Sequence, residues 1–355
     1  MFSEAGSIIQ AAIADRAFPA ATIEIGRSTG PLWTQAWGRL GYTPDAMACT
    51  PETVFDLASL TKVIAVASLV MDAISHERLA LDMKVASLIQ TWTGPDRAGV
   101  TIRHLLEHAS GLPAHVRLFE HASGRAQFER AIVESPLEYP PGTRSLYSDL
   151  GFMLLGFILA DVNQAPLDAQ FQAVRASWPG CESLTYRPSP GERVRIAPTE
   201  QDSWRGRLLQ GEVHDENAAA LGGVAGHAGL FGDVRSVGAF ATLLLVTFHQ
   251  RTSLGEPRLL RRFATKSTVP DSSRALAWDT MKPTSSCGTL MSPTSIGHTG
   301  FTGTSLWIDH ERDLYVALLT NRVHPTREND AMIALRPQVH DAIVRAFDRE
   351  FATGR

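Results

Sequence analysis

The stretch DLASLTKVIAVA, residues 56–67, places Ser59 three positions before Lys62, the only charged residue between Ala58 and Met71. The run contains neither glycine nor proline, and its length predicts a helix that begins near Ser59. Because positions i and i+3 share one face of a helix, the hydroxyl and the amine should meet. A helix that is apolar on all sides is typical of a buried element, so the pair should lie inside the protein.

This arrangement has the chemistry of an acylating serine. Burial disfavours an ammonium ion, so Lys62 is predicted to become a neutral base that takes the Ser59 proton. The first turn of the helix also offers free N–H groups to a developing oxyanion. The alternative is a chance tetrapeptide whose lysine extends from a helix end to solvent.

A second informative segment is YPPGTRSLYSDLGF, residues 139–152. Pro-Pro-Gly indicates a turn, and residues 151–160 read as a buried apolar helix. Tyr147 and Asp149 therefore stand on a short loop that leads into a helix, and their side chains can project to the same side. A tyrosine near a lysine can relay protons. The alternative is an ordinary half-buried tyrosine and an N-capping aspartate.

The third segment is SIGHTGFTGTSLWID, residues 295–309. It reads as a strand, and Gly300 and Gly303 inside it suggest close approach of another molecule to the backbone. The alternative is a hairpin whose glycines relieve crowding, with a structural His298. A turn at 309–313 and a returning strand at 314–320 should follow.

In this order, Ser59-x-x-Lys62, Tyr147-Ser148-Asp149 and the motif that begins at His298 resemble the signature elements of the penicillin-recognising serine hydrolases. This family includes β-lactamases, D,D-peptidases, esterases and amidases. The resemblance implies that Ser59 attacks a carbonyl while Lys62 and Tyr147 share the base and acid roles. The remaining assignments that it implies are oxyanion N–H groups on Ser59 and Phe301, an orienting role for Asp149 toward Lys62 or the substrate amide, and substrate contacts from His298, Thr299, Gly300 and His227.

The chain looks most like the class C β-lactamase branch, with two departures. That branch usually has asparagine in place of Asp149 and lysine in place of His298. A histidine weakens the fixed positive charge that meets a β-lactam carboxylate. Weak β-lactam hydrolysis is therefore expected.

A narrower resemblance lies in residues 211–218, 222–231 and 320–329. Similar strings occur in a subgroup with exo-acting N-acetylmuramyl-L-alanine amidases and a penicillin-binding carboxypeptidase-like protein. Arg322 and Arg327 in the last string could hold a substrate carboxylate, or be solvated surface arginines.

A metal site is another interpretation of part of this region. His214, Asp215, Glu216 and His227 could form a cluster, but their spacing matches no zinc signature. We predict no metal and no cofactor.

Composition bounds the function class. The 355 residues are 44% hydrophobic, enough for a large core, and the net charge of -4 argues against a nucleic-acid partner. No uncharged stretch reaches membrane-spanning length, and the N-terminus lacks a secretory pattern. Three widely spaced cysteines suit reduced thiols. We expect a cytoplasmic protein, with a small molecule or peptide as substrate and no membrane partner.

The resemblance implies an α+β fold, in one catalytic domain over residues 1–355. An antiparallel sheet flanked by helices would come from 1–84 and 271–355, and a mainly helical lobe from 85–270, with the cleft between them. Residues 20–26 and 32–38 should pair as a hairpin, and 331–351 should be helical. Residues 180–217 should form a long ordered loop at the cleft rim.

The function expected from the sequence is acyl-enzyme hydrolysis of a peptidoglycan-derived amide. The same scaffold also suits a carboxylesterase or a weak β-lactamase. An alternative of another class is a ligand sensor that is acylated but never turns over.

Overall fold

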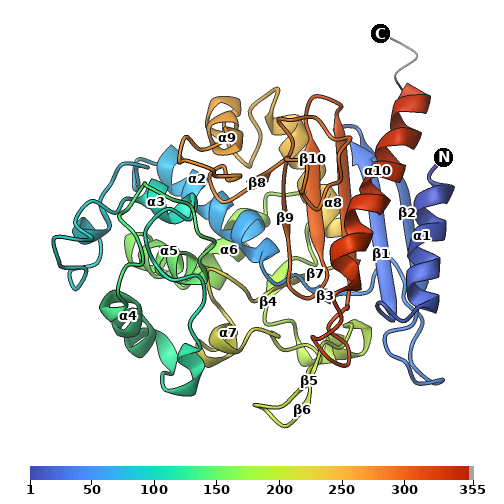
Figure 1. Cartoon of the computed structure of the whole chain (residues 1–355), viewed down its shortest axis with the longest axis horizontal. Coiled ribbons are helices and arrows are strands. Elements are labelled where there is room, and N and C mark those ends of the chain that lie inside the picture. Colours follow the sequence, from blue (N-terminus) through green and yellow to red (C-terminus); the bar gives the residue numbers. More distant parts are fainter. Residues whose placement is uncertain (352–355) are drawn as a thin grey trace.

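The computed structural model describes residues 1–351, and a six-stranded antiparallel sheet dominates one side of the protein (Figure 1). Its strands follow the order β2, β1, β11, β10, β9, β8, so segments from both ends of the chain pair at its centre. The strand bounds are β1 Ala20–Arg27, β2 Gly30–Gly38, β8 Asp279–Thr280, β9 Ile296–Thr299, β10 Ser305–Asp309 and β11 Leu314–Thr320. The sheet and its helices confirm the α+β class.

Helices cover both faces of this sheet because β11 is apolar on both sides. Successive strand residues point to opposite faces. Val316 and Leu318 belong to the core beneath α1 (Ser3–Ala14) and α10 (Ala331–Phe351). Tyr315, Ala317 and Leu319 belong to the core that includes α8 (Val234–Thr247).

The other side of the protein is mainly helical and surrounds the helix that follows Ser59 (Figure 1). That helix opens with a π-helical turn at Lys62–Val66 and continues as α2, which packs against α5 and α6. As predicted, the first turns of α5 are wholly apolar and buried after Asp149. The helix bounds are α2 Ala67–Ser75, α3 Ile102–Leu106, α4 Gly124–Glu134, α5 Asp149–Val162, α6 Leu167–Arg175 and α9 Pro257–Ala264.

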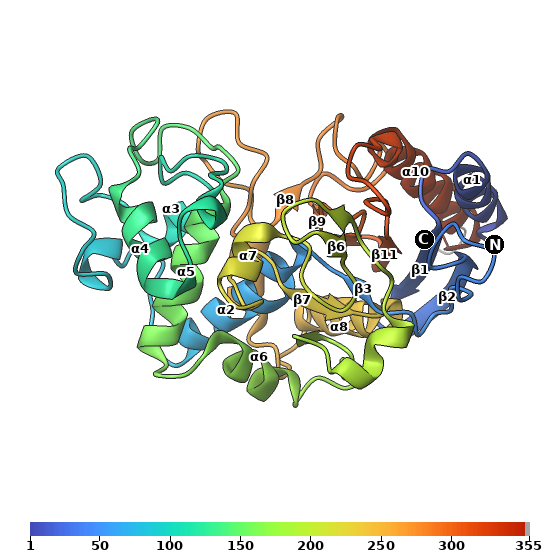
Figure 2. The ribbon, with the colours of Figure 1, turned by 90° about the horizontal axis from the view of Figure 1, so that it is seen from below.

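Short elements connect the two sides. Figure 2 shows α7 and β6 across the junction between the helices and the sheet. Residues 180–217 form much of this region, as short elements rather than one long loop. The bounds are β3 Phe55–Asp56, β4 Thr185–Tyr186, β5 Gln201–Asp202, β6 Arg207–Leu208, α7 Glu216–Ala220 and β7 Leu230–Gly232, with 3-10 turns at Val85–Ser87, Leu118–Glu120 and Pro190–Arg195.

Several predicted elements form with nearly the predicted bounds, including the first hairpin, the strand at 314–320 and the helix at 331–351. The run 295–309 is instead two strands, β9 and β10, so the hairpin alternative is correct. Helix α8 lies inside the range assigned to the helical lobe, yet it packs on β1 and β11, whose apolar face needs a cover.

Within residues 1–351, no single helix is long and apolar enough to cross a membrane. In this described range, only the pair α5 and α6, bent by 78°, reaches that length and composition together.

Candidate active site

The turn before Ser59 is held in a strained backbone conformation. Ala58 has φ of 47°, a left-handed value that non-glycine residues rarely adopt. Asp56 stabilises it, because its Oδ1 accepts the Ala58 N–H at 2.8 Å. Thr302 fixes the same segment by donating its hydroxyl to the Asp56 carbonyl at 2.7 Å. The helix then starts directly after Ser59, as predicted, and the π-helical turn contains Lys62.

Lys62 lies on the same face as Ser59, and its Nζ is 2.9 Å from the Ser59 Oγ. The Nζ is also 2.9 Å from Asp149 Oδ1 and 2.9 Å from the His227 carbonyl. An ammonium has three N–H donors, and three acceptors surround this one.

The predicted neutral Lys62 is therefore wrong for this resting state. Burial opposes the charge, but the Asp149 carboxylate and Tyr147 outweigh it and raise the pKa of Lys62. The family resemblance implied that Asp149 orients Lys62, but the prediction of a neutral amine rested on burial alone and left out the charge of this carboxylate.

Tyr147 completes the group around the nucleophile. Its hydroxyl donates to the Ser59 Oγ at 2.8 Å, while burial raises the pKa of the phenol and the Lys62 charge partly offsets that rise. His108 supports this loop, since its Nδ1 accepts the Ser148 N–H at 2.9 Å and its ring lies 4.6 Å from that of Tyr147. Helical spacing brings Ser59 and Lys62 together, and the fold brings Tyr147 to them.

Asp149 holds Lys62 and also meets His115, a residue that the sequence analysis missed. The His115 Nδ1 is 3.4 Å from Asp149 Oδ2. Burial would raise the pKa of Asp149, but the Lys62 charge and the His115 contact hold it well below its usual range. The carboxylate is therefore ionised at neutral pH. Its contact with Lys62 is one of the two roles expected for it.

The turn between β9 and β10 lies against the nucleophile. A Cβ on Gly300 would come within 2.6 Å of the Leu57 carbonyl and 3.3 Å of the Ala58 Cβ. The glycine therefore permits close approach of the chain itself, not of another molecule as the strand interpretation suggested. Gly303 has φ of 110° and faces Thr320.

His298 is buried near the end of β9. Burial, with the charges of Arg274 and Lys62, lowers the pKa of His298 well below its usual value, so the ring is neutral at pH 7. Its Nδ1 contacts the Thr299 carbonyl at 2.8 Å, and its Nε2 has no partner among residues 1–351.

The two N–H groups expected to form the oxyanion hole are free in the described part of the chain. Neither the Ser59 nor the Phe301 N–H donates a hydrogen bond there. Both residues line one cavity of about 640 Å³, together with Tyr147 and His298. A carbonyl bound beside Ser59 would find unoccupied donors.

Arg274 is a second pocket residue that the sequence analysis missed. Its guanidinium lies 5.1 Å from the centre of the Tyr147 ring. The nearest carboxylate, on Asp279, is 3.9 Å away, a weak contact. Arg274 comes from a loop without a motif, so only the fold identifies it.

His227 is buried below the site and does not line the cavity, contrary to its expected role in substrate binding. Its carbonyl binds Lys62, and its Nε2 lies 2.8 Å from Asp215 Oδ1. No group of three or more His, Cys, Asp or Glu side chains within residues 1–351 is arranged for a metal ion.

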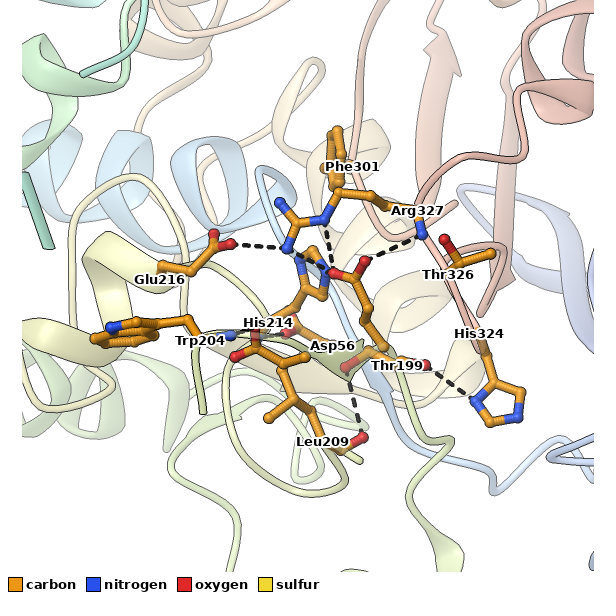
Figure 3. Close-up of polar contacts among 12 residues, drawn as sticks. Asp56, Thr199, Trp204, Leu209, His214, Glu216, Phe301, His324, Thr326 and Arg327 are labelled. Atoms are coloured by element: carbon orange, nitrogen blue, oxygen red, sulfur yellow. Dashed lines mark hydrogen bonds and ion pairs between the residues drawn. The ribbon is translucent and has the colours of Figure 1, made fainter. Parts of the chain in front are cut away.

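Arg327 lines the cavity but is already engaged by two carboxylates (Figure 3). Its guanidinium lies 2.5 Å from Glu200 and 2.7 Å from Glu216. Glu200 also accepts from the His214 ring at 2.9 Å. Arg327 thus ties Glu200 and Glu216 to the loop between β11 and α10, and it is not free to bind a substrate carboxylate as the sequence suggested.

Arg322 is likewise directed to the backbone. It donates from Nε to the Phe301 carbonyl at 2.8 Å and from Nη1 to the Asn329 carbonyl at 2.9 Å. Its guanidinium covers the Phe301 ring at 4.6 Å.

Comparison with known proteins gives one family. A β-lactamase family profile matches residues 6–340. A protein of Escherichia coli (strain K12) named "Putative D-alanyl-D-alanine carboxypeptidase" is 29% identical over 352 residues, covering 87% of this chain and 80% of that protein. A Salmonella agona (strain SL483) protein of the same name is 28% identical, with the same coverage.

Solved structures of similar fold support the same architecture. EstCE1, described as a hydrolase with promiscuous acyltransferase activity, has a TM-score of 0.75 at 20% identity, over 96% of this chain and 98% of its own. A class C β-lactamase from Rhodobacter sphaeroides has a TM-score of 0.76 at 17% identity, over 97% and 99%.

Proposed function

The chain belongs to the β-lactamase family of serine hydrolases, and from this premise we propose that it is an amidase or peptidase that acts on peptidoglycan-derived peptides through a Ser59 acyl-enzyme. One observation carries the proposal: the Ser59 hydroxyl lies between Lys62 and Tyr147, at 2.9 and 2.8 Å, at the wall of a cavity. A serine held by two proton-transfer groups is the arrangement of an activated nucleophile.

The reaction would proceed in two halves. When the Lys62–Tyr147 pair has lost a proton, it can accept the Ser59 proton as Oγ attacks the substrate carbonyl, and the free N–H groups of Ser59 and Phe301 stabilise the oxyanion. The same pair then returns the proton to the leaving amine. Water enters and attacks the acyl carbon while it gives a proton to the pair; the pair then returns this proton to the Ser59 Oγ as the acyl group leaves as a carboxylic acid.

The charges around the cavity differ from those of class C enzymes and suit a peptide with a terminal carboxylate. His298 is neutral where class C enzymes usually have lysine, so the site lacks that attractive partner for a β-lactam carboxylate. Arg274 supplies a cation with only a weak carboxylate contact, which suits the terminal carboxylate of a peptide. The names of the curated relatives support a peptide substrate.

A carboxylesterase is the second candidate, and the cavity edge supports it. Phe301 is 50% exposed and Ile333 is 69% exposed, and both line the cavity. Such an apolar edge suits the acyl group of an ester.

The first test concerns Ser59. A fluorophosphonate should label this residue, and Ser59→Ala should abolish both labelling and turnover of p-nitrophenyl acetate. Ser110→Ala, at a buried serine outside the site, is the control. Labelling that persists at another serine in Ser59→Ala contradicts the assignment. Release of product beyond one equivalent distinguishes an enzyme from an acylated sensor.

The second test concerns the substrate. We expect kcat/KM to be higher for a muramyl peptide than for nitrocefin, with Arg274→Met lowering the peptide value about tenfold or more, the scale of a charged hydrogen bond. The neutral ester should be affected less. A clear preference of the wild-type protein for nitrocefin, or an equal loss on ester and peptide, would rule out this choice of substrate.

A further inference from the structure

Arg336 of α10 lies beside the turn that carries Phe301 and lines the same cavity, and no element of the expected mechanism uses it. The residue is 8% exposed. Its Nη2 donates to the Gly300 carbonyl at 3.3 Å and to the Thr304 carbonyl at 3.1 Å. These carbonyls stand at the two ends of the turn between β9 and β10, and the Gly300 N–H itself donates to the Thr304 carbonyl at 2.7 Å.

Arg336 has no carboxylate partner among residues 1–351, and its buried Nε has no hydrogen-bond partner there. Burial, with the nearby charge of Arg322, lowers the pKa of Arg336 to about 10, which leaves it charged at neutral pH. A buried charge without a counter-ion costs free energy. An apolar residue at this position would avoid that cost, so a functional use of the charge is indicated.

The Gly300 carbonyl belongs to the same peptide unit as the Phe301 N–H. A cationic donor on a peptide oxygen polarises that unit, and the N–H at its other end becomes a stronger donor. Arg322 bonds the next carbonyl, that of Phe301, at 2.8 Å. Two guanidinium groups therefore hold the carbonyls on both sides of the Phe301 N–H.

We propose that Arg336 is a positioning residue that strengthens and orients the Phe301 N–H as an oxyanion donor. This inference rests on the proposed function, because it needs Phe301 to face an oxyanion. In this role Arg336 stabilises the transition state through the Phe301 N–H and does not bind a substrate anion. The reason for this choice is that the Nη2 of Arg336 already donates to two carbonyls of the turn.

The test compares Arg336→Gln and Arg336→Lys with Arg345→Gln, a surface change on the same helix. With neutral p-nitrophenyl acetate, kcat in Arg336→Gln should fall about tenfold with KM little changed, because the loss weakens one oxyanion donor without removing it. Inhibition by phenylboronic acid, which forms a tetrahedral adduct on serine, should weaken by a similar factor. Arg336→Lys should keep part of the activity, and guanidinium ion should restore kcat in Arg336→Ala.

The outcomes separate this inference from the proposed function. If wild type is labelled at Ser59 but Arg336→Gln keeps its kcat, the inference is wrong and the proposed function stands. A rise in KM for a carboxylate-bearing peptide, with ester kcat unchanged, would assign Arg336 to anion binding instead. Lost activity that guanidinium does not restore in a folded Arg336→Ala protein would indicate a merely structural side chain. Wild type that is never labelled contradicts the proposed function itself.

Discussion

The ion pair between Lys62 and Asp149 sets the protonation state of the nucleophile's neighbours. In the resting site Lys62 donates to Ser59 and cannot accept its proton, because the Asp149 carboxylate raises the pKa of the amine. The reactive form must lose one proton from the Lys62–Tyr147 pair. Activity should therefore rise with pH into the alkaline range.

Asp149→Asn tests this argument. Removing the anion removes the stabilisation of the ammonium, so the pKa of Lys62 falls and the deprotonated form appears at lower pH. The rising limb of kcat/KM against pH should move to lower pH by roughly 1–3 units, because one opposite charge in contact shifts a pKa by about that much. Asp161→Asn, at a surface ion pair, should leave the limb unchanged. An unshifted limb in Asp149→Asn would show that another group controls it.

A contact between two side chains can be predicted from the sequence when the two residues lie close together in the chain. Ser59 and Lys62 share a helix turn, so spacing alone predicted their contact. Arg274 and Arg336 stand in segments without a motif, and only the folded chain brings them to the cavity. The neutral Lys62 predicted from burial is wrong for a different reason: the family resemblance implied a contact with Asp149, but not how strongly that carboxylate raises the pKa of the amine.

At the level of elements, the β9–β10 hairpin is locked against the strained turn before Ser59. Thr302 and Thr304 donate to the carbonyls of Asp56 and Leu57, and Gly300 lets the two backbones touch. The sequence showed the glycines but not their neighbour, because a contact between two turns that lie far apart in the chain leaves no local signal. Read as one strand, this run would have no turn to present the Phe301 N–H.

Gly300→Ala should push the β9–β10 hairpin away from the turn before Ser59. The added Cβ would lie 2.1 Å from the Thr304 Oγ1 and 2.6 Å from the Leu57 carbonyl, so the turn must move. We expect the free energy of unfolding to fall by roughly 1–3 kcal/mol and kcat to fall by a much larger fraction of its value. Urea unfolding measures the first quantity and ester kinetics the second. Gly99→Ala has no atom within 4 Å of its new Cβ and is the control; equal behaviour of the two variants would contradict the argument.

At the scale of the whole molecule, Arg327 joins three segments that the sequence places far apart. It links Glu200, which is buried just before β5, to the loop that precedes α10. It also links Glu216 at the start of α7 to the same loop (Figure 3). The α+β architecture could be predicted from the order of the motifs and from the apolar periods at both ends of the chain. This link could not, because two carboxylates and one guanidinium show no sequence pattern that pairs them.

Arg327→Met tests the link through the pH dependence of stability. Burial would raise the pKa of Glu200, but its bonds to His214 and Arg327 lower it from 4.5 to about 2. A lowered pKa contributes stability that is fully present above pH 4.5 and is lost as the pH falls toward 2. At pH 7 the variant should therefore lose roughly 1–3 kcal/mol, the range for a lost charged hydrogen bond. Between pH 4.5 and 2 the difference from wild type should shrink, because the wild-type protein loses the same contribution on protonation. Urea unfolding of both proteins across this range measures the difference, with Arg130→Met as a surface control. A difference that stays constant with pH would show that Arg327 acts through packing and not through its charge on Glu200.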